Sequence, residues 1–174
     1  MIPPTLHTER LTLTGLGERH FAPLAAFYAS ERSRFVGGPM TAERTWRTLA
    51  SEIGHWTLRG YGRFAVEDKV TGDMVGLVGP WNPDGWPEPE LGWDLMNGFE
   101  GKGYAQEAAT EARHWVYETK GWTTAISLTA DGNHPSAKLA QRMGCSHDGR
   151  FTHEVHGTMD VWRHPSPSEL KATA

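Results

Sequence analysis

Three glycines stand just before a run of strong helix formers in the segment GFEGKGYAQEAATEA, residues 98–112. Glycine weakens a helix, so its clustering at a helix start points to a backbone that another group must approach closely. The first N–H groups of a helix are unpaired and carry a partial positive charge, which is typical of a site for an anion such as a phosphate. A glycine-rich turn before an ordinary surface helix is the alternative interpretation.

Two common phosphate loops do not fit this segment. A P-loop requires G-x-x-x-x-G-K-[ST], but Gly98 and Gly103 are followed by Tyr104 and Ala105. A dinucleotide-binding G-x-G-x-x-G motif that starts at Gly101 requires a small residue at the position of Gln106. The segment therefore predicts neither a nucleoside triphosphate site nor a dinucleotide site.

Composition restricts the compartment and the partners. The chain has 174 residues, 38% of them hydrophobic, which suits a single domain with a real core. A net charge of −4 and the lack of a basic cluster argue against nucleic acid as the main partner. The single cysteine excludes an internal disulfide and fits a reducing compartment. With no apolar run of about 20 residues and no signal-peptide pattern in MIPPTLHTER, we expect a cytoplasmic protein with no membrane partner.

Hydrophobic spacing predicts a mixed α/β domain. The expected order is one strand, two helices, three strands, a helix, a strand, a helix and a final pair of strands. The third helix lies between two strands, and a right-handed crossover makes such strands parallel. We expect one domain over residues 1–165 and a disordered tail over residues 166–174.

Several motifs, in this order, resemble the GNAT superfamily of acyl-CoA-dependent N-acyltransferases, and within it the ribosomal-protein alanine N-acetyltransferase (RimJ/RimL-type) branch. They are TERLTLTGL near the start, ELGWDL, GFEGKGYAQEA, NHPSAKLAQRMGC and DVWRH near the end. The resemblance implies a GNAT-like fold: a mostly antiparallel central sheet, a parallel pair splayed around the acyl-CoA loop, and about four helices. It also implies acetyl transfer from acetyl-CoA to a primary amine, either a protein N-terminus or a small molecule.

The resemblance assigns the acetyl-CoA contacts. The backbone N–H groups of the glycine loop would hold the pyrophosphate, and those at the end of the preceding strand would polarise the thioester. Asn133 and Ser136 match the contacts to pantetheine, although local roles as turn and first-turn residues are the alternative. Lys102 either adds a cation or is a solvated side chain. The expected contacts are Leu95, Met96, Asn97, Gly101, Lys102, Gly103, Tyr104, Ala105, Asn133 and Ser136.

Glu90 and Asp94 share one face of their strand, because side chains alternate with period two. In the branch that this chain resembles, the catalytic carboxylate matches Glu90, so Glu90 is the first candidate for the base and Asp94 the second. The alternatives are that both side chains face solvent, or that the amine arrives neutral and no base is essential. Trp81 and Trp86, in a proline-rich loop, are candidates to line the acceptor pocket.

The sequence departs from the family pattern at three places. Glu100 stands where Gln or Arg is usual, and we expect it to face solvent. The usual Tyr near the leaving sulfur is missing around Leu139, Ala140 and Gln141, and Cys145 stands where Phe is usual. The missing Tyr and the unusual Glu100 motivate an alternative function as a catalytically weak acyl-CoA sensor or scaffold.

The histidines invite a metal interpretation, because Cys145, His147, His153 and His156 lie within twelve residues. HEVH lacks the i, i+4 spacing of a zinc helix, and in a strand His153 and His156 would point to opposite faces. We therefore expect no metal. The sequence leaves open whether the protein is a monomer or a homodimer.

Overall fold

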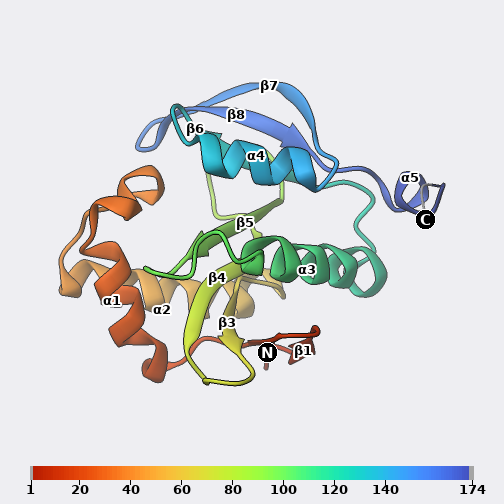
Figure 1. Cartoon of the computed structure of the whole chain (residues 1–174). Helices are drawn as coiled ribbons and strands as arrows, with labels where there is room; N and C mark the ends of the chain where they lie inside the picture. Colours follow the sequence, from red (N-terminus) through yellow and green to blue (C-terminus); the bar gives the residue numbers. More distant parts are fainter. Residues whose placement is uncertain (1, 173–174) are drawn as a thin grey trace.

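The strands of the chain form one eight-stranded sheet (Figure 1). The computed structural model describes residues 2–172. The strands are β1 (Leu6–His7), β2 (Leu11–Thr14), β3 (Phe64–Asp68), β4 (Met74–Trp81), β5 (Glu90–Leu95), β6 (Ile126–Ala130), β7 (Ser146–His153) and β8 (Gly157–Arg163).

The strand order in the sheet is β1-β2-β3-β4-β5-β6-β8-β7. Neighbouring strands are antiparallel, except for β5 and β6, which are parallel. The mixed α/β fold with one parallel pair, predicted from the order of the elements, is therefore confirmed. Helix α3 connects these two strands.

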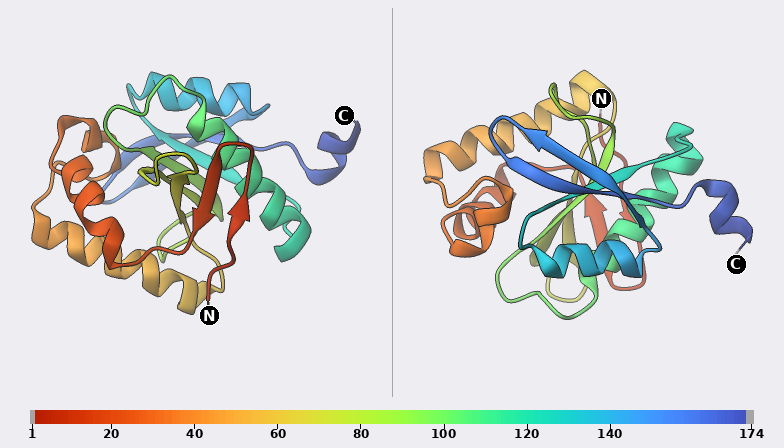
Figure 2. Two further views of the ribbon diagram at one scale, coloured as in Figure 1. Left: turned by 60° about the horizontal axis from the view of Figure 1, so that its bottom comes forward. Right: turned by 90° about the horizontal axis from the view of Figure 1, so that it is seen from above.

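The helices cover both faces of the sheet (Figure 2). They are α1 (Phe21–Tyr28), α2 (Ala42–Arg59), α3 (Tyr104–Lys120), α4 (His134–Arg142) and α5 (Pro167–Ala172), with short 3-10 segments η1 (Glu18–His20) and η2 (Glu31–Val36). Among residues 2–172, no helix has both the length and the apolar character of a membrane span.

Two hydrophobic cores lie on opposite faces of the sheet. On one face, the alanines of α3 and residues of α4 pack against side chains such as Phe64, Val66 and Leu91. On the other face, α1 and α2 pack against side chains such as Ala65 and Leu77. Small side chains on α3 let that helix lie close to the sheet, next to the strand that leads into the glycine loop.

Apolar spacing in residues 42–59 predicts one buried face made of Trp46, Leu49, Ala50, Ile53 and Trp56, and of these Leu49 and Trp56 are buried in α2. Thr41 caps this helix by accepting a hydrogen bond from the Arg44 N–H. Trp46, however, is 55% exposed and Ile53 is also exposed. Glu52 and His55 are buried instead, because both have polar partners inside the molecule.

The C-terminal segment is not the disordered tail that its composition suggests. Residues Pro167–Ala172 form α5, which Ser166 and Glu169 support at its start: Ser166 Oγ lies 2.7 Å from Glu169 Oε2. Residues 173 and 174, the last part of the predicted tail, lie outside the described residues.

Candidate active site

The glycine loop between β5 and α3 has a backbone that only glycine adopts easily. Gly98, Gly101 and Gly103 have φ angles of +88°, +73° and +80°. Gly103 is the N-cap of α3, and no side chain caps the first N–H groups of this helix. An added Cβ at Gly101 would have none of the described atoms within 4 Å, so this part of the loop is open to a ligand.

Arg10, in the turn between β1 and β2, holds this loop from behind. Its Nη1 donates to the carbonyl oxygen of Lys102 (2.9 Å), and its Nε pairs with Glu107 Oε2 (2.7 Å). The Tyr104 hydroxyl donates to Asp68 Oδ2 (2.7 Å), which ties the first residue of α3 to the end of β3. Motif reasoning missed Arg10, because its partners lie more than 90 residues away in the sequence.

The parallel strands β5 and β6 pair at a single register position, Glu90 with Ile126, and then separate. The Met96 N–H donates to the Val75 carbonyl on β4 (3.0 Å), so the backbone of every second residue before it also faces β4. The N–H and C=O groups of Leu91, Trp93 and Leu95 consequently face the gap toward β6. Within the predicted Leu95–Asn97 range, the N–H of Met96 is engaged and that of Leu95 faces the gap.

A cleft of about 290 Å³ occupies this gap. It brings together seven of the residues expected from the sequence: Glu90, Asp94, Leu95, Gly101, Ala105, Asn133 and Ser136. Met96 and Asn97 instead line a separate hollow near α1. Lys102 lies outside the lining of the cleft, with its ammonium 5.2 Å from the centre of the Phe99 ring.

Asn133 and Ser136 lie at the start of α4, across the cleft from β5. Asn133 is the N-cap residue, but its side chain makes no capping hydrogen bond. Ser136 Oγ accepts a hydrogen bond from Trp93 Nε1 (2.9 Å), so its own proton is available to a further acceptor. Both residues line the cleft.

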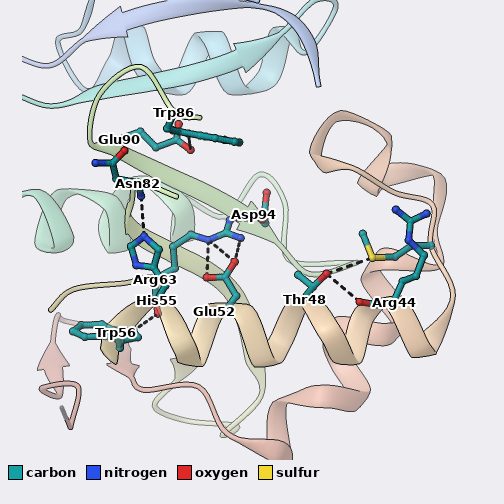
Figure 3. Close-up of polar contacts among 11 residues, drawn as sticks. Arg44, Thr48, Glu52, His55, Trp56, Arg63, Asn82, Trp86, Glu90 and Asp94 are labelled. Atoms are coloured by element: carbon teal, nitrogen blue, oxygen red, sulfur yellow. Dashed lines mark hydrogen bonds and ion pairs between the residues drawn. The ribbon is translucent and has the colours of Figure 1, made fainter. Parts of the chain in front are cut away.

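Glu90 is buried at the point where β5 and β6 separate, and its side chain lies beside Trp86 (Figure 3). Two donors hold this carboxylate. Trp86 Nε1 donates to Oε1 (2.9 Å), and the Leu128 N–H donates to Oε2 (3.2 Å). Burial raises the pKa of Glu90 to about 7, although Trp86 and Arg63 act in the opposite direction. A carboxylate with this pKa can take up or release a proton near neutral pH.

Asp94 is also buried, but it is paired with a cation. Arg63 Nη1 donates to Asp94 Oδ2 (2.8 Å), and the same guanidinium pairs with Glu52 from α2 (Figure 3). Burial raises the pKa of Asp94, and Arg63 opposes that shift. The two carboxylates therefore differ: among residues 2–172 Glu90 has no direct ion-pair partner, whereas Asp94 belongs to a buried Glu52–Arg63–Asp94 cluster.

Gly92 separates Glu90 from Asp94 on the same face of β5 and leaves a space between them. A Cβ at Gly92 would lie 3.7 Å from Glu90 Oε1 and 3.7 Å from Arg63 Cδ. These are ordinary contact distances, and Gly92 does not have a positive φ. The absent side chain therefore opens the cleft floor beside the Glu90 carboxylate.

A family model for the acetyltransferase (GNAT) domain matches residues 10–146, most of the chain and all of this cleft except Met159. The chain belongs to the GNAT acetyltransferase family. This acetyltransferase is 36% identical to a crystal structure of an acetyltransferase from Agrobacterium tumefaciens, with a TM-score of 0.86 over 94% of this chain and 95% of that chain.

Two further relatives are more distant. The Bacillus subtilis (strain 168) protein YkkB is 30% identical over 90 residues, and the match spans about half of each protein (49% of this chain and 52% of YkkB). The fold is also similar to that of RimL, a ribosomal L7/L12 alpha-N-protein acetyltransferase in complex with coenzyme A. That similarity has 13% identity and a TM-score of 0.75, and covers 93% of this chain and 98% of the other.

The two candidate tryptophans of the acetyltransferase have different surroundings. The Trp81 ring stacks on His55, with centroids 4.4 Å apart, and lies 5.1 Å from the Arg63 guanidinium carbon. Neither Trp81 nor Trp86 is among the residues that line the cleft, and Trp81 packs behind the buried cluster. Trp86 donates to Glu90 and contacts the His153 and His156 rings.

The expectation that His153 and His156 point to opposite faces of a strand is wrong. Strand β7 ends at His153 and residues 154–156 form a turn, which brings the two ring centroids within 4.8 Å of each other. Burial, and then the neighbouring His153, lower the pKa of His156. Over residues 2–172, no three His, Cys, Asp or Glu side chains are grouped closely enough to hold a metal ion.

Glu100, which departs from the usual family loop, is half-exposed and forms an ion pair. Its Oε1 lies 2.6 Å from Arg32 Nε, and Arg32 also donates to the Leu95 carbonyl (2.9 Å). The carboxylate is therefore neutralised by a cation at the edge of the cleft, rather than simply facing solvent.

Proposed function

We propose that this acetyltransferase moves an acetyl group from acetyl-CoA to a primary amine, by direct attack within a ternary complex, with Glu90 as the general base. The observation that carries the proposal is a buried carboxylate with a pKa of about 7, placed beside the open floor at Gly92. A base is most effective when its pKa lies near the working pH.

The residues of the cleft fit acetyl-CoA, which supplies the acyl group as a thioester. The uncapped N–H groups at the start of α3 suit the pyrophosphate, because they combine free donors with a partial positive charge. The outward-facing backbone of β5, ending at Leu95, suits the amide groups of pantetheine and the thioester oxygen. Asn133 and Ser136 face the same space from α4 and can contact pantetheine.

The amine reaches the thioester over Gly92. Glu90 takes the amine proton, the nitrogen forms a bond to the acetyl carbon, and the bond from that carbon to sulfur breaks. The sulfur leaves as thiolate or takes a proton from water, since a free thiol has a pKa of about 8.5. Asp94 is held by Arg63, which suits a structural and electrostatic role better than proton transfer.

The acceptor is a protein N-terminus or a small-molecule amine. Glu90 and the half-neutralised Glu52–Arg63–Asp94 cluster give this side of the cleft an acidic character, which attracts a cationic amine before it loses its proton. Trp86, beside Glu90, can contribute a cation–π contact.

One observation favours a second function as an acyl-CoA sensor or scaffold: no hydroxyl stands at Leu139, Ala140 or Gln141 to protonate the leaving sulfur. Calorimetric titration with acetyl-CoA, together with a thiol-release assay over a panel of amines and N-terminal peptides, separates the two functions. Enzymatic transfer predicts release that depends on the amine. Tight binding with no release on any acceptor would support the sensor.

A further inference from the structure

The ladder between β5 and β6 stops one step after it begins. The Ile126 N–H donates to the Pro89 carbonyl (3.3 Å). Bonds donated by one strand of a parallel ladder advance by two residues, so the next bond donated by β6 would run from the Leu128 N–H to the Leu91 carbonyl. Two side chains take the place of this missing bond.

Glu90 takes the donor of the missing bond, and Ser127 takes its acceptor. The Leu128 N–H donates to Glu90 Oε2 (3.2 Å), while Ser127 Oγ donates to the Leu91 carbonyl (2.6 Å). The candidate base and Ser127 therefore complete the same interrupted rung from opposite strands. Any shift of β5 against β6 at this point would also move the Glu90 carboxylate.

The Ser127 hydroxyl is itself fixed by His164, the residue that follows β8. A carbonyl can only accept, so the Ser127 proton points to Leu91, and Ser127 Oγ must accept from His164 Nε2 (2.9 Å). His164 therefore carries its ring proton on Nε2. Its backbone N–H donates to the Ala125 carbonyl (2.9 Å), which anchors the ring beside β6.

Arg113, from α3, completes the chain of contacts. Its Nη1 donates to the Met143 carbonyl (2.8 Å) and lies 3.4 Å from His164 Nδ1, the nitrogen without a proton. Ser127, His164 and Arg113 are all buried, at 1%, 2% and 8% exposure. Burial, then Arg113 and Arg163, lower the pKa of His164 to about 3, so the ring stays neutral in the working pH range.

We infer that Ser127, His164 and Arg113 form a positioning relay that fixes where β5 and β6 separate and thereby holds the Glu90 carboxylate in place for catalysis. The relay connects α3, β6 and the end of β8 to the point in the cleft where β5 and β6 separate. None of its three side chains lines the cleft, so each acts through the β5 backbone and Glu90. The catalytic part of this inference rests on the proposed function.

Ser127→Ala tests the relay, because it removes the bond to Leu91 with little change in volume. We expect kcat to fall about 10-fold or more, since small displacements of catalytic groups are costly, while KM for acetyl-CoA changes less than about threefold. We also expect the Leu128 amide to exchange its hydrogen about fivefold faster, as its bond to Glu90 loosens.

The pH profile gives a readout that a purely structural role would not move. The groups that face Glu90 are Trp86, Leu128 N–H, Arg63 and Asp94, and the Leu128 N–H lowers its pKa. Loosening that bond in Ser127→Ala should move the acid limb of kcat to higher pH with the same amine.

Thr129→Val is the matched control, because Thr129 is a buried hydroxyl on the same strand whose partner is Trp162 Nε1 (2.9 Å), away from β5. If Ser127→Ala does not fold, His164→Gln and His164→Leu form a second pair. Gln can still donate to Ser127 and should keep kcat within about threefold, whereas Leu should give the 10-fold loss.

The relay is overturned if Ser127→Ala matches Thr129→Val in kcat, in pH profile and in Leu128 exchange, whatever happens to its thermal stability. If the wild-type protein transfers acetyl to no amine, the proposed function fails on its own. The hydrogen-exchange rates of the Leu128 amide then still decide whether Ser127 fixes the point where β5 and β6 separate.

Discussion

The two sides of the cleft are made from different parts of the chain. The side that we propose for acyl-CoA consists mainly of backbone: positive-φ glycines, the uncapped start of α3 and the edge of β5 that faces the gap. The side that we propose for the acceptor consists of buried side chains: Arg63 contacts both Glu52 and Asp94, and Glu90 lies near this cluster (Figure 3). From this difference we expect acetyl-CoA binding to depend on the backbone conformation of the first side. We expect amine binding and kcat to depend on the side-chain chemistry of the second side and on pH.

The largest effect is expected on the acceptor side, from Glu90→Gln. Gln keeps the size and one of the two acceptor oxygens but cannot take a proton, so kcat should fall about 10²-fold at neutral pH. The loss should shrink as pH rises and free amine becomes abundant. Steady-state rates measured at intervals of about one pH unit, from about pH 6 to about pH 9, test both effects.

Glu88→Gln is the control for this change, because Glu88 lies two residues earlier and pairs with Arg163 (2.6 Å) outside the cleft. It should leave kcat within about twofold. An unchanged rate in Glu90→Gln would transfer the role to Asp94 or to no side chain.

On the acyl-CoA side, Gly103→Val should weaken acetyl-CoA binding by about 10-fold or more. A branched side chain strains a φ of +80°, and its Cβ would lie 3.4 Å from Arg10 Nη2, which supports the loop, so the N–H groups that phosphate oxygens must reach would be displaced. Gly121→Val, at the other end of α3 with a φ of +68°, carries the same kind of strain away from the cleft. Calorimetric titration of both variants with acetyl-CoA separates the effect of backbone strain from the loss of ligand contact. Equal affinities of the two variants for acetyl-CoA would contradict a phosphate site in this loop.

Gly92→Ala tests whether the amine passes over the space between the two carboxylates. The added methyl meets Glu90 and Arg63 at ordinary contact distances, so the fold should tolerate it. We expect KM for the amine to rise about 10-fold and KM for acetyl-CoA to change little, because about 1.4 kcal/mol of lost contact corresponds to that factor. Equal changes in both constants would place the acceptor elsewhere.

The smallest effects are expected from Trp86, whose ring and N–H have separable roles. Trp86→Phe keeps a ring but removes the donor to Glu90 Oε1, so the pKa of Glu90 should rise and the acid limb of kcat should move to higher pH. Trp86→Ala should in addition raise KM for the amine severalfold. If KM for the amine stays the same in both variants, Trp86 does not contact the acceptor.

Each side of the cleft could be predicted from the sequence in part: Leu95, Gly101, Ala105, Asn133 and Ser136 line it as expected, whereas Met96, Asn97, Lys102, Gly103 and Tyr104 do not. Gly101, Gly103 and Asn133 belong to motifs with fixed spacing, and local spacing decides local backbone geometry. Glu52 could not be found in this way, because apolar spacing on α2 selected Trp46 for the core. The helix instead turns a carboxylate inward toward Arg63, a partner eleven residues later in the chain.

The roles of residues that contact distant segments across the sheet could also not be predicted from the sequence. Arg10 supports the glycine loop, and Ser127 meets Leu91, only because the sheet brings distant segments together. No pattern in the neighbourhood of either residue indicates its partner. The same limit applies to the C-terminal α5, whose polar composition alone suggested disorder.

The central claim is that the Glu90 carboxyl titrates near neutral pH in the folded protein, where it accepts hydrogen bonds from Trp86 and Leu128. Carbon-13 NMR of the Glu90 side-chain carboxyl, assigned with Glu90→Gln and followed through a pH titration, tests it most directly. The account predicts a midpoint at about pH 7, caused chiefly by burial. A midpoint near 4.5, the ordinary value for Glu, would contradict it, because such a carboxylate would be a weak base for an amine proton.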